Sequence, residues 1–288
     1  MQPIRLIALD MDGTLLTRID PVTACIPQDN ADALQRCVAA GVHIALASGR
    51  MPDDAAFYAL DAGIPAHIIG LNGGVIIDRP MGEPFSQRLL PEDTARRVFG
   101  ILLDAGVDVI VFGPWEVCCV QDRPLAWAQR ELGTYFGRPG GRLTYRTGPS
   151  AAQALLPAAG KIVAITRDDP AALAAARQRI ALACPEVSIS SSWGNNFEVN
   201  PAGVDKGSAL AILAAQLGVT LAETMAIGDN GNDAPMLRAA GCGVAMGNAT
   251  PEALAAASHV TLSCGEFGVA AAIRALVFGE DIPGVRPL

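Results

Sequence analysis

Short apolar runs alternate with helix-patterned segments at both ends of the chain, and this alternation restricts the possible folds more than any other feature. The runs at 4–9, 42–47 and 224–228 are almost entirely apolar, and a stretch with apolar residues at helical spacing follows each of them. Strands of this kind lie in a parallel sheet that helices cover on both faces. The further ranges expected in this part are strands 67–70, 74–78 and 242–246 and helices 28–40, 52–61, 232–240 and 250–257. The pattern predicts an α/β core.

The middle of the chain has a different pattern, which predicts a separate α+β unit between about residues 82 and 197. Residues 107–113 and 115–121 have the pattern of a hairpin, and a turn-rich stretch follows further on. The other ranges expected here are helices 92–105, 124–136 and 170–183 and strands 161–166, 187–192 and 196–201. Prolines and glycines near 80–84 and 201–203 fit two linkers. We therefore expect a core made of 1–81 and 198–288.

Composition excludes several classes of protein. The chain has 288 residues, of which 51% are hydrophobic, and a net charge of −8, so it can bury a large core but lacks the basic character of a nucleic-acid binder. No apolar run is long enough for a membrane span, and the N-terminal residues do not follow the pattern of a signal peptide. Seven cysteines without a C-x-x-C spacing favour reduced thiols. We expect a cytoplasmic protein without membrane or nucleic-acid partners, and the sequence leaves its oligomeric state open.

Two carboxylates follow the first expected strand. Asp10 and Asp12 lie two residues apart, before Gly13 and Thr14. Residues i and i+2 of an extended segment point the same way, so both side chains can reach one ligand beyond the carboxyl end of the strand. Buried charge is costly unless it is paired, bound to a metal or used in a reaction. An Asp-Gly turn with solvated acids is the alternative.

Two further polar groups follow other expected elements. Ser48, Gly49 and Arg50 come between a strand and a helix that begins near Pro52, a place suited to binding an anion. A helix cap with a surface arginine would have the same pattern. Lys206 lies at the start of a helix, where a cation opposes the helix dipole, which hints at a function, whereas a solvated lysine is the alternative.

A fourth group follows the strand at 224–228. Asp229 ends the strand, and Asn232 and Asp233 open the next helix. The loop does not match a calcium-binding loop, because Ala234 stands where glycine is needed. A hard divalent ion held by a few carboxylates and waters suits it better, which favours Mg²⁺, whereas a simple helix cap is the alternative.

Together, in this order, these four groups resemble the motifs of the haloacid dehalogenase (HAD) superfamily. The insertion and the stretches LNGG (71–74), 196–210, AMGNA (245–249) and 267–273 resemble its Cof-type, class IIB group. The resemblance implies a Rossmann-like doubly wound parallel-sheet core with an inserted α+β cap. It also implies a Mg²⁺-dependent phosphatase that acts on a small phosphorylated metabolite of the sugar phosphate, FMN or pyridoxal phosphate type.

The resemblance also implies roles for individual residues. Asp10 would attack phosphorus and form an aspartyl-phosphate, and Asp12 would act as general acid and base. The Mg²⁺ ligands would be Asp10, Asp229 and the backbone carbonyl of Asp12, and Asp233 would orient metal-bound waters or Lys206. The groups expected to bind the phosphate are Ser48, Lys206, Asn232 and the amides of Met11 and Gly49. Arg50 and cap residues would face the leaving group.

Two other functions remain open at this point. A phosphotransferase or phosphomutase of the same fold would pass the phosphoryl group to a second substrate instead of water. A non-catalytic protein that binds a phosphorylated ligand would keep the fold without turnover.

Overall fold

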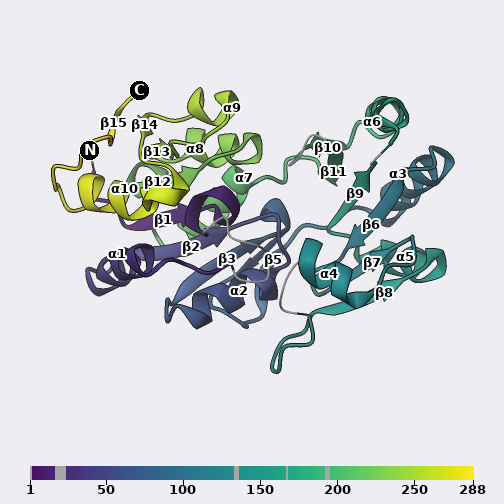
Figure 1. Cartoon of the computed structure of the whole chain (residues 1–288), viewed down its shortest axis with the longest axis horizontal. Helices are drawn as coiled ribbons and strands as arrows, with labels where there is room; N and C mark the ends of the chain where they lie inside the picture. Colours follow the sequence, from purple (N-terminus) through teal and green to yellow (C-terminus); the bar gives the residue numbers. More distant parts are fainter. Residues whose placement is uncertain (1, 17–23, 133–135, 167, 192–194) are drawn as a thin grey trace.

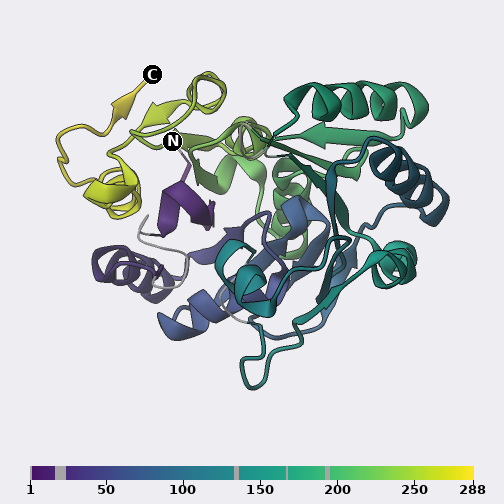
Figure 2. The same cartoon turned by 45° about the vertical axis from the view of Figure 1, so that its right-hand side comes forward.

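The computed structural model describes residues 2–16, 24–132, 136–166, 168–191 and 195–288. Its strands form a nine-stranded sheet and a six-stranded sheet, which belong to two units placed side by side along the long axis of the molecule (Figure 1). Figure 2 shows that both chain ends lie on the unit with the larger sheet. Within the described residues, no helix is long and apolar enough to cross a membrane.

The nine-stranded sheet is built outward from β1. Its strands, in spatial order, are β15 (Arg286–Pro287), β14 (His259–Val260), β13 (Cys242–Ala245), β12 (Thr224–Gly228), β1 (Leu6–Leu9), β2 (His43–Ala47), β3 (Ala66–Gly70), β4 (Val75–Ile77) and β5 (Pro84–Gln87). The strands from β14 to β3 run parallel, and β4, β5 and β15 are antiparallel additions. The strand order reverses between β1 and β12, so the carboxyl ends of these two strands form the place where such sheets bind ligands.

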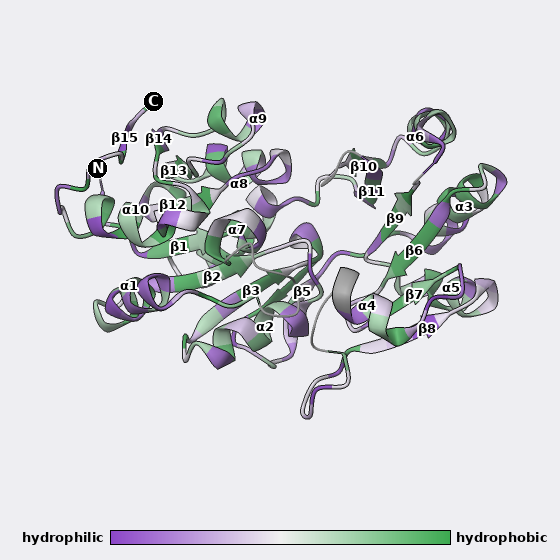
Figure 3. Cartoon of the chain, viewed as in Figure 1, coloured by the Kyte–Doolittle hydropathy of each residue, from purple (hydrophilic) through white to green (hydrophobic). Residues whose placement is uncertain are grey.

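Helices cover both faces of this sheet. They are α1 (Gln28–Ala39), α2 (Pro52–Asp61), α7 (Lys206–Gln216), α8 (Ala234–Ala239), α9 (Pro251–Leu254) and α10 (Gly268–Leu276). On one face Ile7 and Ile44 pack in one cluster with α1, α2 and α10, and on the other Leu6 and Ala45 pack with α7, α8 and α9. Figure 3 shows the central strands as hydrophobic along their length, as burial on both faces requires. The doubly wound α/β fold is confirmed.

The second unit is an α+β arrangement around the six-stranded sheet. Its strands, in spatial order, are β10 (Val187–Ser190), β11 (Asn196–Pro201), β9 (Lys161–Ile165), β6 (Asp108–Phe112), β7 (Glu116–Cys119) and β8 (Thr144–Thr147), and its helices are α3 (Glu92–Asp104), α4 (Leu125–Glu131), α5 (Pro149–Leu155) and α6 (Pro170–Ala183). Val111 and Ile162 lie on the face that α3, α5 and α6 cover. Phe112 and Val163 lie on the opposite face and belong to the same cluster as residues of the nine-stranded unit.

Several elements differ from the sequence expectations. Pro84, expected in a linker, begins β5, which pairs with β4 at the edge of the larger sheet, where a proline removes no hydrogen bond from a central ladder. The turn-rich stretch that was not expected to be regular contains β8 and leads into α5. The helix expected over 124–136 is observed as α4, and residues 133–135 lie outside the described part of the chain.

Candidate active site

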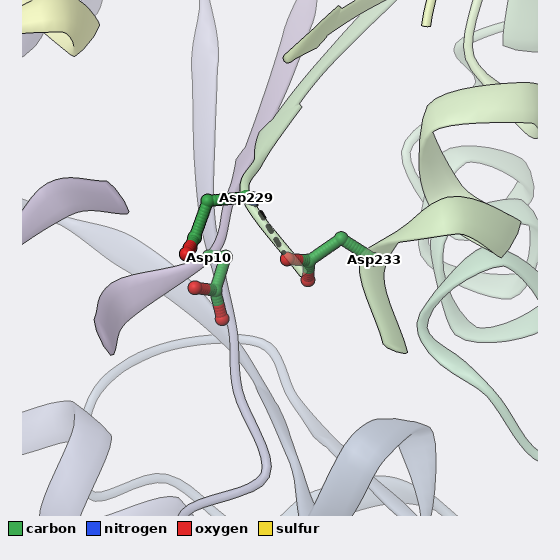
Figure 4. Close-up of side chains that lie close together, drawn as sticks. All are labelled: Asp10, Asp229 and Asp233. Atoms are coloured by element: carbon green, nitrogen blue, oxygen red, sulfur yellow. Dashed lines mark hydrogen bonds between the residues drawn. The ribbon is translucent and has the colours of Figure 1, made fainter. Parts of the chain in front are cut away.

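Asp10 and Asp229 meet at the point where the strand order reverses. Asp10 follows β1 and Asp229 follows β12, and these neighbouring parallel strands align Leu9 with Ile227. The Asp10 amide donates to the carbonyl of Ile227 at 2.9 Å, so the carboxyl ends of β1 and β12 are held together at the edge of the sheet. Both aspartates are buried, and Figure 4 shows their carboxylates next to each other with Asp233 close by.

Lys206 joins this cluster from the first turn of α7. Its Nζ lies 2.5 Å from Asp10 Oδ1 and 2.6 Å from Asp233 Oδ1, and its side chain is fully buried. Burial alone would lower the pKa of Lys206, but the two carboxylates outweigh it and raise that pKa above its usual value. The same two carboxylates offset the unfavourable interaction between the Lys206 ammonium and the positive end of the helix dipole of α7. Lys206 therefore remains charged inside the protein.

The three carboxylates fit a divalent cation. One oxygen each of Asp10, Asp229 and Asp233 lies within 4.8 Å of the others, and the single ammonium of Lys206 balances only one of the three charges. Burial, together with the charge of Asp233, raises the pKa of Asp10 well above its usual value, and burial also raises the pKa of Asp229. Burial is the main cause of both pKa shifts and the neighbouring Asp233 adds to it, so a hard cation with oxygen ligands would favour the charged form of each carboxylate.

Asp233 is already engaged by the protein. Its Oδ2 accepts the backbone N–H groups of Asp229 and Asn230 at 3.0 and 2.9 Å, while Oδ1 accepts the hydrogen bond from Lys206. These contacts fix the loop after β12 and the position of the ammonium. Asp229 and Asp10 therefore have more free acceptor capacity than Asp233.

Thr14 and Asn248 were not among the expected site residues, yet both orient Asp229. Thr14 Oγ1 donates to Asp229 Oδ1 at 2.8 Å, and Asn248 Nδ2 contacts the Gly13 carbonyl at 2.9 Å and Asp229 Oδ2 at 3.5 Å. Gly13 has a φ of +86°, and a Cβ there would lie 2.6 Å from Asp229 Oδ2. The wide turn over Met11–Leu15 thus needs glycine at this position.

Ser48, Gly49 and Asn232 come together around Asn72, another residue that the sequence analysis did not single out. Ser48 is buried at the end of β2 and accepts the Arg50 N–H at 3.2 Å. A Cβ on Gly49 would lie 3.0 Å from Asn72 Oδ1, which also accepts a hydrogen bond from Asn232 Nδ2 at 3.4 Å. The segment after β2 therefore adjoins the loop after β12. Only the LNGG stretch could have pointed to Asn72.

Arg50 links Asp12 to α2. Its guanidinium contacts Asp12 through two hydrogen bonds of 2.8 Å and Asp54 through one of 2.6 Å. Desolvation would raise the pKa of Asp12, but the charge and hydrogen bonds of Arg50 outweigh it and lower that pKa. In this arrangement Asp12 is a carboxylate paired with Arg50.

The family of the chain follows from comparison with known proteins. A family profile described as haloacid dehalogenase-like hydrolase matches residues 7–273, a range that contains the whole six-stranded sheet and all strands of the nine-stranded sheet except β15 and the first residue of β1. The chain belongs to the haloacid dehalogenase-like hydrolases. The membership confirms the superfamily resemblance drawn from the four motifs and makes the protein a hydrolase.

Relatives of this hydrolase match it over most of its length. It is 30% identical over 302 residues to phosphatase YwpJ of Bacillus subtilis, across 95% of this chain and 100% of the relative. It is 31% identical over 254 residues to the HMP-PP phosphatase of Serratia proteamaculans, across 86% and 85%. A solved haloacid dehalogenase-like hydrolase from B. subtilis has a TM-score of 0.79 and 27% identity, across 95% of this chain and 100% of that one. The arrangement of both units is therefore shared with known hydrolases.

Proposed function

We propose that this hydrolase is a Mg²⁺-dependent phosphomonoesterase that acts on a small phosphorylated metabolite through an aspartyl-phosphate. The observation that carries the proposal is the buried Asp10 carboxylate, held 2.5 Å from Lys206 and next to Asp229, with Asp12 two residues further along the chain. In this proposal one carboxylate attacks phosphorus and the second one transfers the proton. The two relatives named as phosphatases support hydrolysis of a phosphate ester.

In this proposal the positive groups around Asp10 make attack on a phosphate dianion possible. A phosphate monoester and a carboxylate repel each other unless cations and N–H donors neutralise the charge. Lys206, the Ser48 hydroxyl and the amides of Met11 and Gly49 would bind the phosphoryl oxygens, with Asn232 as a further contact. Asp10 would then form a bond to phosphorus as the bond to the leaving oxygen breaks.

Mg²⁺ would be held by the carboxylates of Asp10 and Asp229 and by the backbone carbonyl of Asp12. When bound, it supplies positive charge that stabilises the transferring phosphoryl group. Asp233 would keep Lys206 and the loop after β12 in place, because both of its oxygens already accept hydrogen bonds.

Asp12 would donate a proton to the leaving oxygen and later accept one from the hydrolytic water. Since Arg50 lowers the pKa of Asp12, the proposal requires the substrate to displace Arg50 from Asp12 and to bring Arg50 toward the leaving group, so that Asp12 takes up from solvent the proton that it then donates. The inserted unit, proposed as a cap over residues 82–197 on a core of 1–81 and 198–288, would exclude water during the first step. β5 pairs with the core sheet, so the first connection lies beyond residue 87. β11 pairs with β9 and β10 of the inserted unit as far as Pro201, so the second connection lies beyond residue 201.

The test is phosphate release from a panel of phosphomonoesters by the wild type, D10N and the matched surface variant D29N. We expect release by the wild type with Mg²⁺, its loss with a chelator, normal activity of D29N and a loss of at least about 10³-fold in D10N. D10N should melt no lower than the wild type, because it removes one buried negative charge while Lys206 keeps Asp233. Turnover by D10N at a normal rate would refute the nucleophile. Transfer of phosphate to an added sugar in preference to water would indicate a phosphotransferase instead.

A further inference from the structure

Lys161 and Glu198 form an ion pair on the face of the six-stranded sheet that is turned toward the core. Lys161 lies on β9 opposite Phe112 of β6, and Glu198 lies on β11 opposite Val163 of β9. Phe112 and Val163 pack in the hydrophobic cluster that continues into the core unit, whereas their strand neighbour Ile162 packs against the outer helices. Because side chains alternate along a strand, the ion pair shares the inner, otherwise largely apolar face.

The pair is nearly closed off from water. Lys161 Nζ lies 3.2 Å from Glu198 Oε2, and the two side chains are 6% and 9% exposed. The ammonium also lies 4.8 Å from the centre of the Phe112 ring. A buried ion pair on an apolar face contributes little stability compared with apolar side chains of the same size. The position of this ion pair therefore indicates a role other than stabilising the sheet.

The core unit reaches this pair through Asn72. Asn72 Nδ2 donates to Glu198 Oε2 at 2.7 Å, and the residue has a φ of +56°, a conformation that asparagine tolerates better than most residues. Asn72 Oδ1 faces Gly49, as described for the candidate active site. A continuous set of polar groups thus runs from Glu198 in the cap to the proposed phosphate-binding segment.

Lys161 itself comes close to that segment. A Cβ on Gly49 would lie 3.5 Å from Lys161 Nζ, so the cap ammonium lies close to the backbone next to Ser48. Gly49, on the core unit, is thus close to a cation that belongs to the other unit, the ammonium of Lys161. A phosphate bound at Ser48 and Gly49 would therefore have its ester oxygen and leaving group close to Lys161 and Glu198.

We infer that Lys161 and Glu198 bind the leaving group, and that this group is an uncharged, polyhydroxylated chain or ring, so that the substrate is a sugar or polyol phosphate. The inference rests on the proposed phosphatase function. A hydroxyl both donates and accepts, and it would find a carboxylate acceptor in Glu198 and donors in Lys161 and Asn72. Since Glu198 already neutralises Lys161, the pair offers no net charge to a second phosphate or a carboxylate. A flat apolar ring would leave these buried polar groups without new partners.

The experiment compares two kinds of ester in the same variants. Initial rates are measured with aldose phosphates of four to six carbons and glycerol phosphate, and with p-nitrophenyl phosphate, whose leaving group has no aliphatic hydroxyls. Pyridoxal phosphate and a sugar bisphosphate complete the panel. The variants are E198Q, K161M and the double variant K161M/E198Q, in which no buried charge is left unpaired. E186Q, which breaks the Arg97–Glu186 ion pair elsewhere in the cap, is the matched control.

For the best hydroxylated substrate we expect kcat/KM to fall by about 30-fold in each variant, while the value for p-nitrophenyl phosphate changes by less than about threefold, because only the former loses hydrogen bonds to charged groups. E186Q should behave as the wild type with both. Equal losses with both kinds of ester, or no loss with either, would overturn the assignment, as would a wild-type preference for pyridoxal phosphate or the bisphosphate. Failure of the wild type to hydrolyse any ester would refute the proposed function itself, and the leaving-group assignment with it.

Discussion

Two arginines of the inserted unit, proposed above as a cap, are paired with aspartates of α2, and the different burial of the two pairs predicts very different contributions to stability. Arg142 donates to Asp53 from its backbone N–H at 2.9 Å and from Nη2 at 2.6 Å, and Trp115 Nε1 donates to the same carboxylate at 3.2 Å. Asp53 is fully buried, whereas Arg142 is 28% exposed. Arg138 contacts Asp61 with equally good geometry, at 2.8 and 2.5 Å, but these side chains are 33% and 49% exposed.

The change to make is aspartate to alanine at each site, combined with arginine to alanine in a double-mutant cycle. Truncating one partner of a buried ion pair costs about 3–5 kcal/mol, and we expect D53A to cost about 3 kcal/mol, because water reaches part of Arg142. D61A should cost no more than about 1 kcal/mol, since an exposed pair is screened and loses side-chain entropy on forming. The coupling energy should be about 2 kcal/mol for Arg142–Asp53 and about 0.5 kcal/mol for Arg138–Asp61.

The assay is urea unfolding of the four single and two double variants beside the wild type, followed by fluorescence and by circular dichroism. Each double-mutant cycle is a control for the other, because both ion pairs join the same segment of the inserted unit to α2. Coupling energies that agree within about 0.5 kcal/mol would show that burial does not set the strength of these contacts, and the reasoning would be wrong.

Three further predictions concern the site and the thiols. Burial raises the pKa of Asp10 and Asp229, so in the metal-free native protein these two groups bind more protons than they do in the unfolded chain. Their contribution to stability should therefore fall as the pH rises from the usual carboxyl pKa toward the raised values. Mg²⁺ competes with the same protons, and calorimetry should show tighter Mg²⁺ binding as the pH rises through that window. T14V, which removes the hydroxyl donor to Asp229 with little change of shape, should lower the free energy of unfolding by about 1–2 kcal/mol and weaken Mg²⁺ binding, measured by urea unfolding and calorimetry. A thiol reagent at pH 8 should label exposed Cys25 quickly, while burial raises the pKa of Cys37, Cys118, Cys119 and Cys242 to about 11 and keeps them unreactive; mass spectrometry after a short pulse identifies the labelled residue.

Much of the fold in both units could be predicted because the strand and helix patterns agree with burial. The strand expected at 224–228 and the helix expected at 170–183 are observed with those bounds. β8 was missed because its residues alternate between exposed and half-buried positions in a sequence rich in glycine. β14 pairs over only two residues, too few for any periodic signal.

The candidate site was predictable to the extent that its residues follow strand ends. Asp10 and Asp229 had to approach each other once β1 and β12 were neighbours in a parallel sheet. Asn72 and Asn248 come from loops whose paths depend on tertiary packing, so no local pattern marked their contacts with Glu198 and Asp229. Whether Arg50 would face substrate or protein could not be read from the sequence either, because Asp54, four residues further along the chain, also binds the guanidinium.

The first turn of α2 connects the cap to the site more directly than the sequence suggests. Asp53 is held by Arg142 and Trp115 of the cap, while the next residue, Asp54, holds Arg50, which in turn holds Asp12. Adjacent residues on a helix point in directions about 100° apart, so one turn of α2 can bind Arg142 through Asp53 and Arg50 through Asp54 without contact between the two arginines. A displacement of the cap that pulls on Asp53 therefore acts on the backbone that positions Asp54. If the substrate displaces Arg50 from Asp12, the same turn must accommodate the released guanidinium, and D53A should then change the rate of turnover as well as stability. Loss of stability in D53A with kcat unchanged would separate the two roles of this turn.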